Sequence, residues 1–277
     1  MASTSVGVST WVWDEATVGN AEAREDLARF TRIKGVTRLF VHASADYERD
    51  ASFEPLAQLV ASATEQGVSI AFVGGDPSWA LPAHRSDGEA FVGRVRRLED
   101  RLAARGLPRS GWILFDIEPY LLPEWKASPQ RVAGQYADLL RALRAASAGA
   151  GLGAWHTIPF WFPTYEADGK TLDRVAIEES DGVVVMAYRN NSKDVQAVAA
   201  PILAHAAELK KRVTVAIETE CVEPNYVTFC GQSASELAQA MGAIESGLRG
   251  SPAYAGLAVH SSASWKRLES RETREAP

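Results

Sequence analysis

The sequence predicts a single (β/α)₈ barrel, also called a TIM barrel, of the α/β class. Three observations support this fold class. The chain has 277 residues, close to the roughly 250 of a typical complete barrel. Short β-branched runs alternate with amphipathic segments rich in Ala, Leu and Arg, a pattern typical of a parallel sheet. No glycine-rich nucleotide-binding motif follows the first run, so an open nucleotide-binding sheet has no support.

Eight β-strands are expected in order along the chain. They are Gly7 to Trp13, Thr37 to Ala43, Ser69 to Gly74, Gly111 to Ile117, Gly151 to Thr157, Gly182 to Tyr188, Arg212 to Glu218 and Ala255 to His260. Successive βα units are joined by right-handed crossovers, and eight such units close into a barrel more readily than they form an open sheet. The open doubly wound sheet remains the structural alternative.

Amphipathic segments between these runs predict the helices. They are Ala21 to Ile33, Phe53 to Gln66, Asp87 to Ala104, Pro129 to Ala148, Asp194 to Lys210 and Ser233 to Gly247. The segment after the fifth strand, TLDRVAIEESD, has room for only a brief helix, so the outer ring is expected to be irregular there. We expect one domain over residues 1–277, with Glu269 to Pro277 as a charged, frayed tail.

Composition limits the classes of partner. The sequence is 46% hydrophobic and 23% charged, with a net charge of -6 and no Lys/Arg-rich run, so nucleic acid is not an expected partner. No apolar run approaches the roughly 20 residues that span a bilayer. The chain as given is expected to be soluble and cytoplasmic, or exported if a signal peptide has been removed. The oligomeric state stays open.

The two cysteines, Cys221 and Cys230, are nine positions apart in a loop-like stretch. They could close a small loop as a disulfide or remain free thiols, and the sequence leaves both possibilities open. No Cys or His spacing suggests structural zinc, and no metal or other cofactor is expected.

Carboxylates gather where the fourth and seventh strands end. Strand side chains alternate with a period of two, so Asp116 and Glu118 face the same way, as do Glu218 and Glu220. The carboxyl ends of barrel strands form the catalytic face of this fold. Asp116, Glu118, Glu218 and Glu220 are therefore the expected catalytic residues.

Further polar and aromatic side chains follow other strands at the same end of the barrel. The expected substrate-binding residues are Trp11, Trp13, His42, Asp76, Trp79, His156, Trp161, Tyr188, Arg189 and His260. Tryptophan planes stack on the apolar faces of sugar rings, so this lining fits a carbohydrate. Each such residue alone could equally be a loop cap or a core side chain; their recurrence at one end of the strands favours a functional mouth.

Paired acids at this position fit the cleavage of a glycosidic bond. One acid protonates the leaving oxygen and a second carboxylate meets the positive charge of the transition state. In one arrangement Glu118 is the acid/base and Glu218 or Glu220 the nucleophile, as in retaining hydrolases with a carboxyl separation of about 5–5.5 Å. In the other, Asp116 orients the substrate and stabilises positive charge while Glu118 donates the proton.

Two short segments resemble the family 18 chitinases. DIEPY, residues 116–120, is similar to the end of that family's strand-four signature, and MAY, residues 186–188, is similar to its Met-x-Tyr on strand six. The resemblance implies substrate-assisted catalysis by the Asp116–Glu118 pair and a substrate-contacting tyrosine at Tyr188. Upstream of Asp116, the positions of further family acids hold Trp112 and Leu114, and Arg189 stands where an acid often follows the tyrosine.

The expected function is therefore that of a glycoside hydrolase or a related carbohydrate-active enzyme, with a small-molecule or oligosaccharide substrate. A divalent-metal-dependent hydrolase or isomerase is the first alternative, because three histidines and several acids converge on one mouth. A sugar-binding barrel without catalysis is the second. Neither the substrate nor the choice between hydrolysis, transfer and lyase chemistry can be deduced from these residues.

Overall fold

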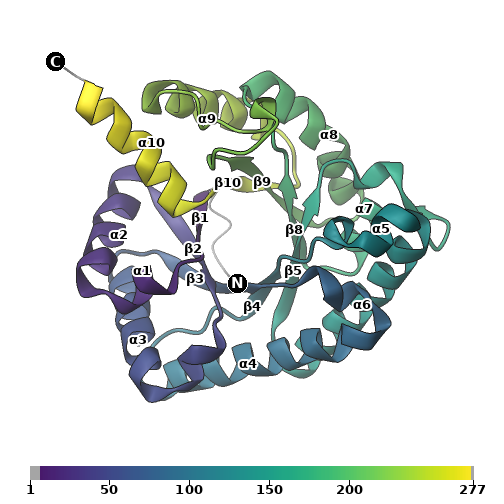
Figure 1. The fold of residues 1–277 in the computed structure, drawn as a ribbon, viewed down its shortest axis with the longest axis horizontal. Coiled ribbons are helices and arrows are strands. Elements are labelled where there is room, and N and C mark those ends of the chain that lie inside the picture. The colour runs from purple at the N-terminus through teal and green to yellow at the C-terminus, as the bar shows by residue number, and fades with distance from the viewer. Residues whose placement is uncertain (1–6, 276–277) are drawn as a thin grey trace.

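The chain folds as a closed barrel of eight parallel strands inside a ring of helices (Figure 1). The computed structural model describes residues 7–275, the last five as backbone only. The barrel strands are β1 Gly7–Val12, β2 Val36–His42, β3 Ser69–Gly74, β4 Trp112–Phe115, β5 Gly153–Pro159, β8 Gly182–Met186, β9 Arg212–Glu218 and β10 Tyr254–His260. The predicted fold class is thus confirmed, and each of the eight expected strands is present.

Helices alternate with these strands. The α-helices are α1 Glu15–Gly19, α2 Ala21–Lys34, α3 Asp50–Glu65, α4 Arg85–Ala104, α5 Pro123–Ala127, α6 Pro129–Gly149, α7 Leu172–Glu178, α8 Ser192–Glu208, α9 Ala234–Leu248 and α10 Ser262–Glu275. Short 3₁₀ turns are η1 Ala45–Glu48, η2 Pro77–Ala80, η3 Pro82–His84, η4 Pro119–Leu121, η5 Phe162–Thr164 and η6 Asn225–Val227. Within residues 7–275, none of the helices combines the length and apolar character that crossing a membrane requires.

The outer ring is irregular after β5, as expected. A two-stranded antiparallel hairpin, β6 Glu166–Ala167 and β7 Lys170–Thr171, precedes the seven-residue helix α7. The hairpin turn holds Asp168 and Gly169 at positive φ, a backbone conformation that glycine adopts without strain.

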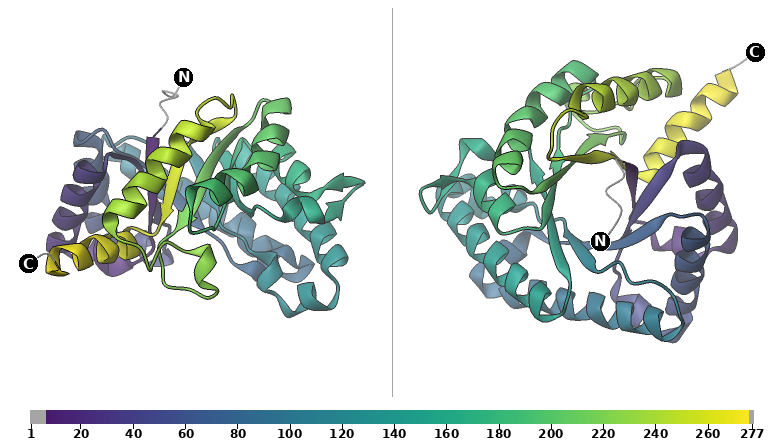
Figure 2. Two further views of the ribbon diagram at one scale, coloured as in Figure 1. Left: turned by 90° about the horizontal axis from the view of Figure 1, so that it is seen from above. Right: turned by 180° about the vertical axis from the view of Figure 1, so that it is seen from behind.

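The barrel closes where the first strand meets the last. β1 lies beside β10 (Figure 2) and pairs with it in parallel. Gly7 is opposite Gly256, and Thr10 is opposite Val259. β9 pairs with the other edge of β10 and places Glu218 beside His260. Around the barrel the strand order is β1-β10-β9-β8-β5-β4-β3-β2, so β4 and β9 are separated by β5 and β8.

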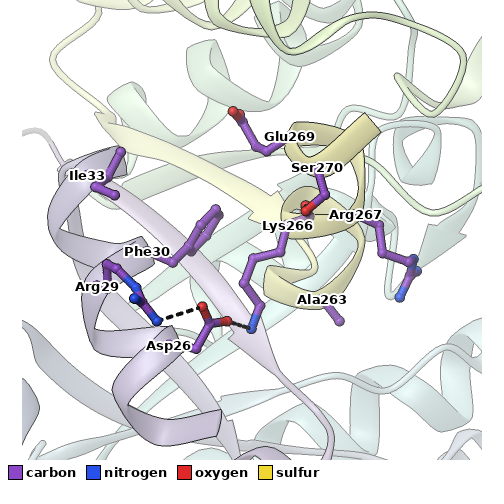
Figure 3. A pocket seen from close by; sticks show the side chains of 9 residues that line it. All are labelled: Asp26, Arg29, Phe30, Ile33, Ala263, Lys266, Arg267, Glu269 and Ser270. Carbon is purple, nitrogen blue, oxygen red and sulfur yellow. Dashed lines mark hydrogen bonds and ion pairs between the residues drawn. The ribbon is translucent and has the colours of Figure 1, made fainter. Parts of the chain in front are cut away.

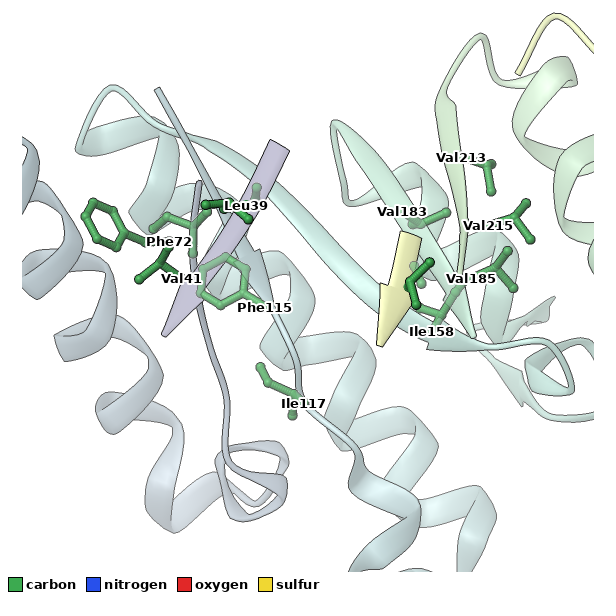
Figure 4. Close-up of a cluster of buried hydrophobic side chains, with 14 of the residues drawn as sticks. Leu39, Val41, Phe72, Phe115, Ile117, Ile158, Val183, Val185, Val213 and Val215 are labelled. Carbon is green, nitrogen blue, oxygen red and sulfur yellow. The ribbon is translucent and has the colours of Figure 1, made fainter. Parts of the chain in front are cut away.

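The core has two layers, because strand side chains alternate between the inside and the outside of the barrel. The inner layer contains Trp11, Phe40, Ala71, Val73, Leu114, Val184, Ala216 and Ala258. The outer layer lies between strands and helices and includes Val41, Phe72, Phe115, Val183 and Val215 (Figure 4). Burial on both faces explains why the strands read as nearly continuous apolar runs.

The C-terminal helix α10 docks against α2. Trp265 is 2% exposed and meets the edge of Phe30 at a centroid distance of 5.1 Å. Lys266 pairs with Asp26 at 2.8 Å in the cavity of about 640 Å³ between the two helices (Figure 3). The expected frayed tail is corrected for residues 269–275, because α10 continues to Glu275 and Glu269 pairs with Lys34 at 2.5 Å. Residues 276–277 of that tail lie outside the described residues.

Cys221 and Cys230 form a disulfide, with their Cα atoms 5.0 Å apart. The bridge closes the loop that follows β9, at the carboxyl end of the barrel. This settles the alternative that the sequence left open.

Candidate active site

The carboxyl ends of the strands bring acids, histidine, tyrosine and tryptophan to one face of the barrel. Asp116 and Glu118 follow β4, Glu218 ends β9 and His260 ends β10. Tyr188 lies just beyond β8 and packs against the inner layer of the barrel. The parallel direction of all eight strands places these ends at the same face.

Asp116 is fixed by neighbours on both sides. Its backbone N–H bonds to the carbonyl of Gly74 at 3.0 Å, which carries the β3–β4 pairing one residue further. A Cβ on Gly75 would overlap the Asp116 carbonyl, so the close approach of these two segments requires glycine. The hydroxyl of Thr157 on β5 donates to Asp116 Oδ1. Burial raises the pKa of Asp116, and the hydrogen bond from Thr157 acts in the opposite direction.

Glu118 lies two residues further and is half-buried. Its pKa is raised, first by burial and second by the negative charge of Asp116. The hydroxyl of Tyr120 donates to Glu118 Oε2 and favours the ionised form. A carboxyl with a raised pKa keeps its proton closer to neutral pH, as a general acid requires.

Glu218 is only 5% exposed, and its oxygens are engaged by internal donors. Oε1 accepts the backbone N–H groups of Thr219 at 2.8 Å and Glu220 at 2.7 Å. Oε2 lies 2.9 Å from Nδ1 of His260. A carboxylate held in this way is suited to orienting His260 and poorly suited to attacking a sugar carbon.

His260 connects Glu218 to the tryptophan at the end of β1. The indole N–H of Trp13 donates to Nε2 of His260 at 2.8 Å, a bond that belongs to the neutral imidazole with its proton on Nδ1 toward Glu218 and that is lost when protonation of Nε2 makes the ring a cation paired with Glu218. Burial acts to lower the pKa of His260, but the hydrogen bond to Glu218 and its charge outweigh burial, so that the pKa is raised. The ring of Trp13 also lies 5.9 Å from that of His42.

The hydroxyl of Tyr188 interacts electrostatically with acids from two strands. Burial raises the pKa of its hydroxyl well above the usual range, and the next contributions are the negative charges of Glu218, Asp116 and Glu118, in that order. Residues from β4 and β9 therefore lie close enough to interact electrostatically around one phenol. Because the hydroxyl stays protonated, it can donate a hydrogen bond to a ligand.

Arg189 and two aromatic rings flank this group at the rim. The guanidinium carbon of Arg189 lies 4.3 Å from the ring centroid of Phe160 and 5.8 Å from that of Tyr226. One N–H of Arg189 bonds to the carbonyl of Tyr188 at 2.7 Å. Trp161 adjoins the same side, with its ring 5.0 Å from that of Tyr120.

Three expected substrate-binding residues have structural contacts instead. His156 is fully buried outside the barrel, stacked on Phe115 at 4.9 Å, and burial lowers its pKa to about 3. Asp76 caps η2 by accepting the backbone N–H of Ser78 at 2.8 Å. Trp79 packs on Phe91 of α4 at 5.5 Å.

Two further expectations need correction. Trp11 does face into the barrel, but it is 1% exposed and lies below His260 at a ring distance of 5.4 Å, so it is a core residue. Glu220 turns toward α10, where it pairs with Arg267 at 2.5 Å and accepts a hydrogen bond from Ser261. An acid committed to an ion pair at the edge is not part of the central group.

Thr157 and Tyr120 belong to the site but were not predicted. Thr157 lies on the inward side of β5 together with Trp155. Because strand side chains alternate, knowing that Trp155 points inward would have predicted that Thr157 does as well. Tyr120 stands two residues after Glu118 within DIEPY. In the part of the chain that the structure describes, no group of three or more His, Cys, Asp or Glu is arranged to hold a metal ion.

No family model matches the sequence, and no curated protein matches it. Solved structures do match. A GH18 chitinase from Pseudoalteromonas aurantia is 10% identical, with a TM-score of 0.60 over 93% of this chain and 94% of its own. A GH18 chitinase from Cycas revoluta in complex with (GlcNAc)4 is 12% identical, with a TM-score of 0.57 over 94% of this chain and 96% of its own.

This chain has the fold of the family 18 chitinases. The barrel of an exo-beta-1,4-mannosidase, Op5Man5 from Opitutaceae bacterium strain TAV5, is similar as well: it is 12% identical, with a TM-score of 0.58 over 92% of this chain and 51% of its own. The expected resemblance to glycoside-hydrolase barrels is thus confirmed at the level of fold. At these identities the likeness concerns the fold alone, and the chemistry has to be argued from the side chains.

Proposed function

We propose that this protein is a glycoside hydrolase that cleaves an oligosaccharide, with Glu118 as the proton donor and Asp116 as its partner. The observation that carries the proposal is the state of Glu118. It is half-buried, and its pKa is raised by burial and by the neighbouring Asp116. Two carboxyls in this relation supply a protonated acid and a negative charge side by side.

Asp116 is preferred over Glu218 as the partner because of their hydrogen bonds. Both oxygens of Glu218 face internal donors, whereas among the described residues Asp116 accepts a side-chain hydrogen bond only at Oδ1, from Thr157. Asp116 can therefore present its second oxygen to a substrate. Glu218 acts instead as the residue that positions His260.

The reaction that fits this pair is substrate-assisted. Glu118 transfers its proton to the glycosidic oxygen as the bond from that oxygen to the anomeric carbon breaks. The carbonyl oxygen of a 2-acetamido group on the same sugar bonds to the anomeric carbon, and Asp116 accepts a hydrogen bond from the amide N–H, which now carries positive charge. Glu118 then takes a proton from the water that attacks the anomeric carbon and restores the acetamido group.

The remaining mouth residues would hold the sugar. Tyr188 can donate its phenolic hydrogen to the acetamido oxygen, since its pKa keeps it protonated. Trp13 and His42 offer ring surfaces on the β1–β2 side, and Arg189 supplies unused N–H donors beside Phe160. The solved Cycas revoluta structure holds (GlcNAc)4, a 2-acetamido oligosaccharide, which is the class of substrate proposed here.

The first experiment replaces the proton donor. Glu118→Gln should lower kcat on (GlcNAc)4 by about 10²- to 10⁴-fold, the usual contribution of general acid–base catalysis. Glu65→Gln, an exposed acid at the end of α3, is the matched control and should leave kcat unchanged. Full activity of Glu118→Gln would contradict the assignment. Binding without products in the unmodified protein would indicate a sugar-binding barrel instead.

The second experiment compares (GlcNAc)4 with cellotetraose, which has the same linkage but lacks the acetamido groups. The substrate-assisted route predicts cleavage of (GlcNAc)4 alone. Cleavage of both would favour the alternative in which Glu218 attacks the sugar. Loss of activity with a chelator, restored by a divalent cation, would favour the metal-dependent alternative.

A further inference from the structure

A second cavity lies at the opposite end of the barrel from the acids. It surrounds the amino-terminal end of β3, has a volume of about 360 Å³ and is lined by side chains from β2, β3, β4, α3 and α4. Small-molecule sites in proteins begin at about 300 Å³. Catalytic groups of this fold lie at the carboxyl ends of the strands, so a ligand here would bind away from the chemistry.

Arg38 lines this cavity and lacks a counter-charge. It lies on β2 two residues before Phe40, and its guanidinium carbon sits 4.9 Å from the ring centroid of Trp112. Its Nε is buried without an acceptor, and among the side chains of residues 7–270 no carboxylate pairs with it. Burial lowers the pKa of Arg38, yet a guanidinium stays charged at any physiological pH.

The other polar groups of the lining are already bonded within the protein. Arg109 pairs with Asp100 at 2.6 Å. The hydroxyl of Ser110 donates to Glu99, and that of Ser69 donates to the carbonyl of Thr37. Arg38 is therefore the lining cation whose charge the described side chains leave uncompensated, an arrangement that costs free energy unless a ligand or solvent meets it.

The rest of the wall is largely apolar. It is formed by Val60, Val68, Ile70, Phe72, Leu102 and Pro108. A ligand that satisfies both parts of the wall has an anionic head and a small apolar body. The planar guanidinium binds a carboxylate through two parallel hydrogen bonds, and the ring of Trp112 holds that plane in place.

We propose that this cavity is a binding site for a small organic carboxylate, with Arg38 as the residue that binds its head. The site is separate from the proposed glycosidase centre and does not depend on it. Its occupation compensates the charge of Arg38 and fills the cavity around the amino-terminal end of β3.

Calorimetric titration with benzoate and benzamide tests the charge requirement, because the two probes match in shape and differ in charge. Benzoate should bind at least about tenfold more tightly than benzamide, and Arg38→Gln should weaken benzoate binding at least about tenfold. Arg249→Gln, in an exposed pair with Glu245, is the control and should bind as the unmodified protein does. Equal binding of the two probes, or no benzoate binding at 10 mM, would overturn the proposal.

A stability measurement separates a ligand site from a structural role. If Arg38 is uncompensated without ligand, Arg38→Gln should unfold in urea at the same concentration as the unmodified protein or at a higher one, and benzoate should raise the midpoint of the unmodified protein alone. A lower midpoint for Arg38→Gln without ligand would mean that Arg38 is a structural residue and would overturn the proposal.

Discussion

Tyr120 sets the ionisation of Glu118 through one hydrogen bond. Its hydroxyl donates to Glu118 Oε2 and favours the charged form, against burial and the charge of Asp116. Removing this donor in Tyr120→Phe should therefore raise the pKa of Glu118. The acid must be protonated to act, so activity falls as pH rises through this pKa. We expect the alkaline limb of the kcat profile to move to higher pH in Tyr120→Phe.

Tyr254→Phe is the control for that profile, because Tyr254 begins β10 at the other end of the barrel. Its alkaline limb should coincide with that of the unmodified enzyme. A limb that stays in place in Tyr120→Phe, or moves to lower pH, would show that Glu118 is not the group that limits activity on the alkaline side.

Glu218 keeps His260 charged to higher pH than burial alone would allow. In Glu218→Gln the pKa of His260 should fall, because burial then dominates; NMR titration of the imidazole measures this. Because the pKa of His260 is higher in the folded protein than in the unfolded chain, the ion pair stabilises the fold fully at pH values below the unfolded pKa of about 6.5. This stabilisation is lost as pH rises through the pKa of His260 in the folded protein. Glu218→Gln should thus lose more unfolding free energy at pH 6, about 3 kcal/mol, than at pH 9. Equal losses would contradict the charged pair.

The sequence alone did not determine which side chains of a strand point into the barrel. Every barrel strand is buried on both faces, so apolar residues do not reveal which side points inward. Asp116 and Glu118 both follow β4, and that their side chains face the same way stays a prediction. On β5 the choice of His156 was wrong by one position, and Thr157 is the inward residue. A one-residue error of this kind moves a side chain from the mouth to the helical layer.

At the scale of elements, strand and helix positions followed from hydrophobic periodicity and turn residues. β3 and β9 have the predicted bounds, Ser69–Gly74 and Arg212–Glu218. The helices α1, α5 and α10 were not predicted. The longest of them is α10, which the charged end of the chain concealed. The stability of α10 depends on contacts with α2, which is distant in sequence. The local sequence pattern of α10 does not reveal these contacts.

The contacts between α10 and α2 predict different losses of unfolding free energy for an apolar and a charged residue. Trp265→Ala should lower the unfolding free energy by about 3–5 kcal/mol, because the ring is fully buried against Phe30. Asp26→Asn should cost less than about 1 kcal/mol, since Asp26 is 47% exposed in its pair with Lys266. Urea unfolding of both variants measures the difference. A larger loss in Asp26→Asn would mean that charge, rather than packing, holds the helix.

The whole molecule is held closed by one seam between chain ends. The register of β1 on β10 pairs residues that are 249 positions apart in sequence, such as Gly7 with Gly256. Neither strand can leave without opening the barrel to water along its length. The acids at the mouth follow β4 and end β9, and His260 ends β10, so their convergence depends on this closure.

A substitution at Gly256 tests the pairing of β1 with β10 most directly. Its φ is +132°, and a Cβ there would overlap the carbonyl of Gly7 on the paired strand. Gly256→Ala should therefore lower the unfolding free energy by about 2 kcal/mol or more. Gly242→Ala, in an exposed turn of α9 with open space around it, is the matched control and should stabilise by roughly 0.5–1 kcal/mol. Because the seam closes the whole barrel, near-UV and far-UV circular dichroism should report the same shifted midpoint in Gly256→Ala. Separate midpoints would show that the barrel can open at β1–β10 while the remaining strands stay folded.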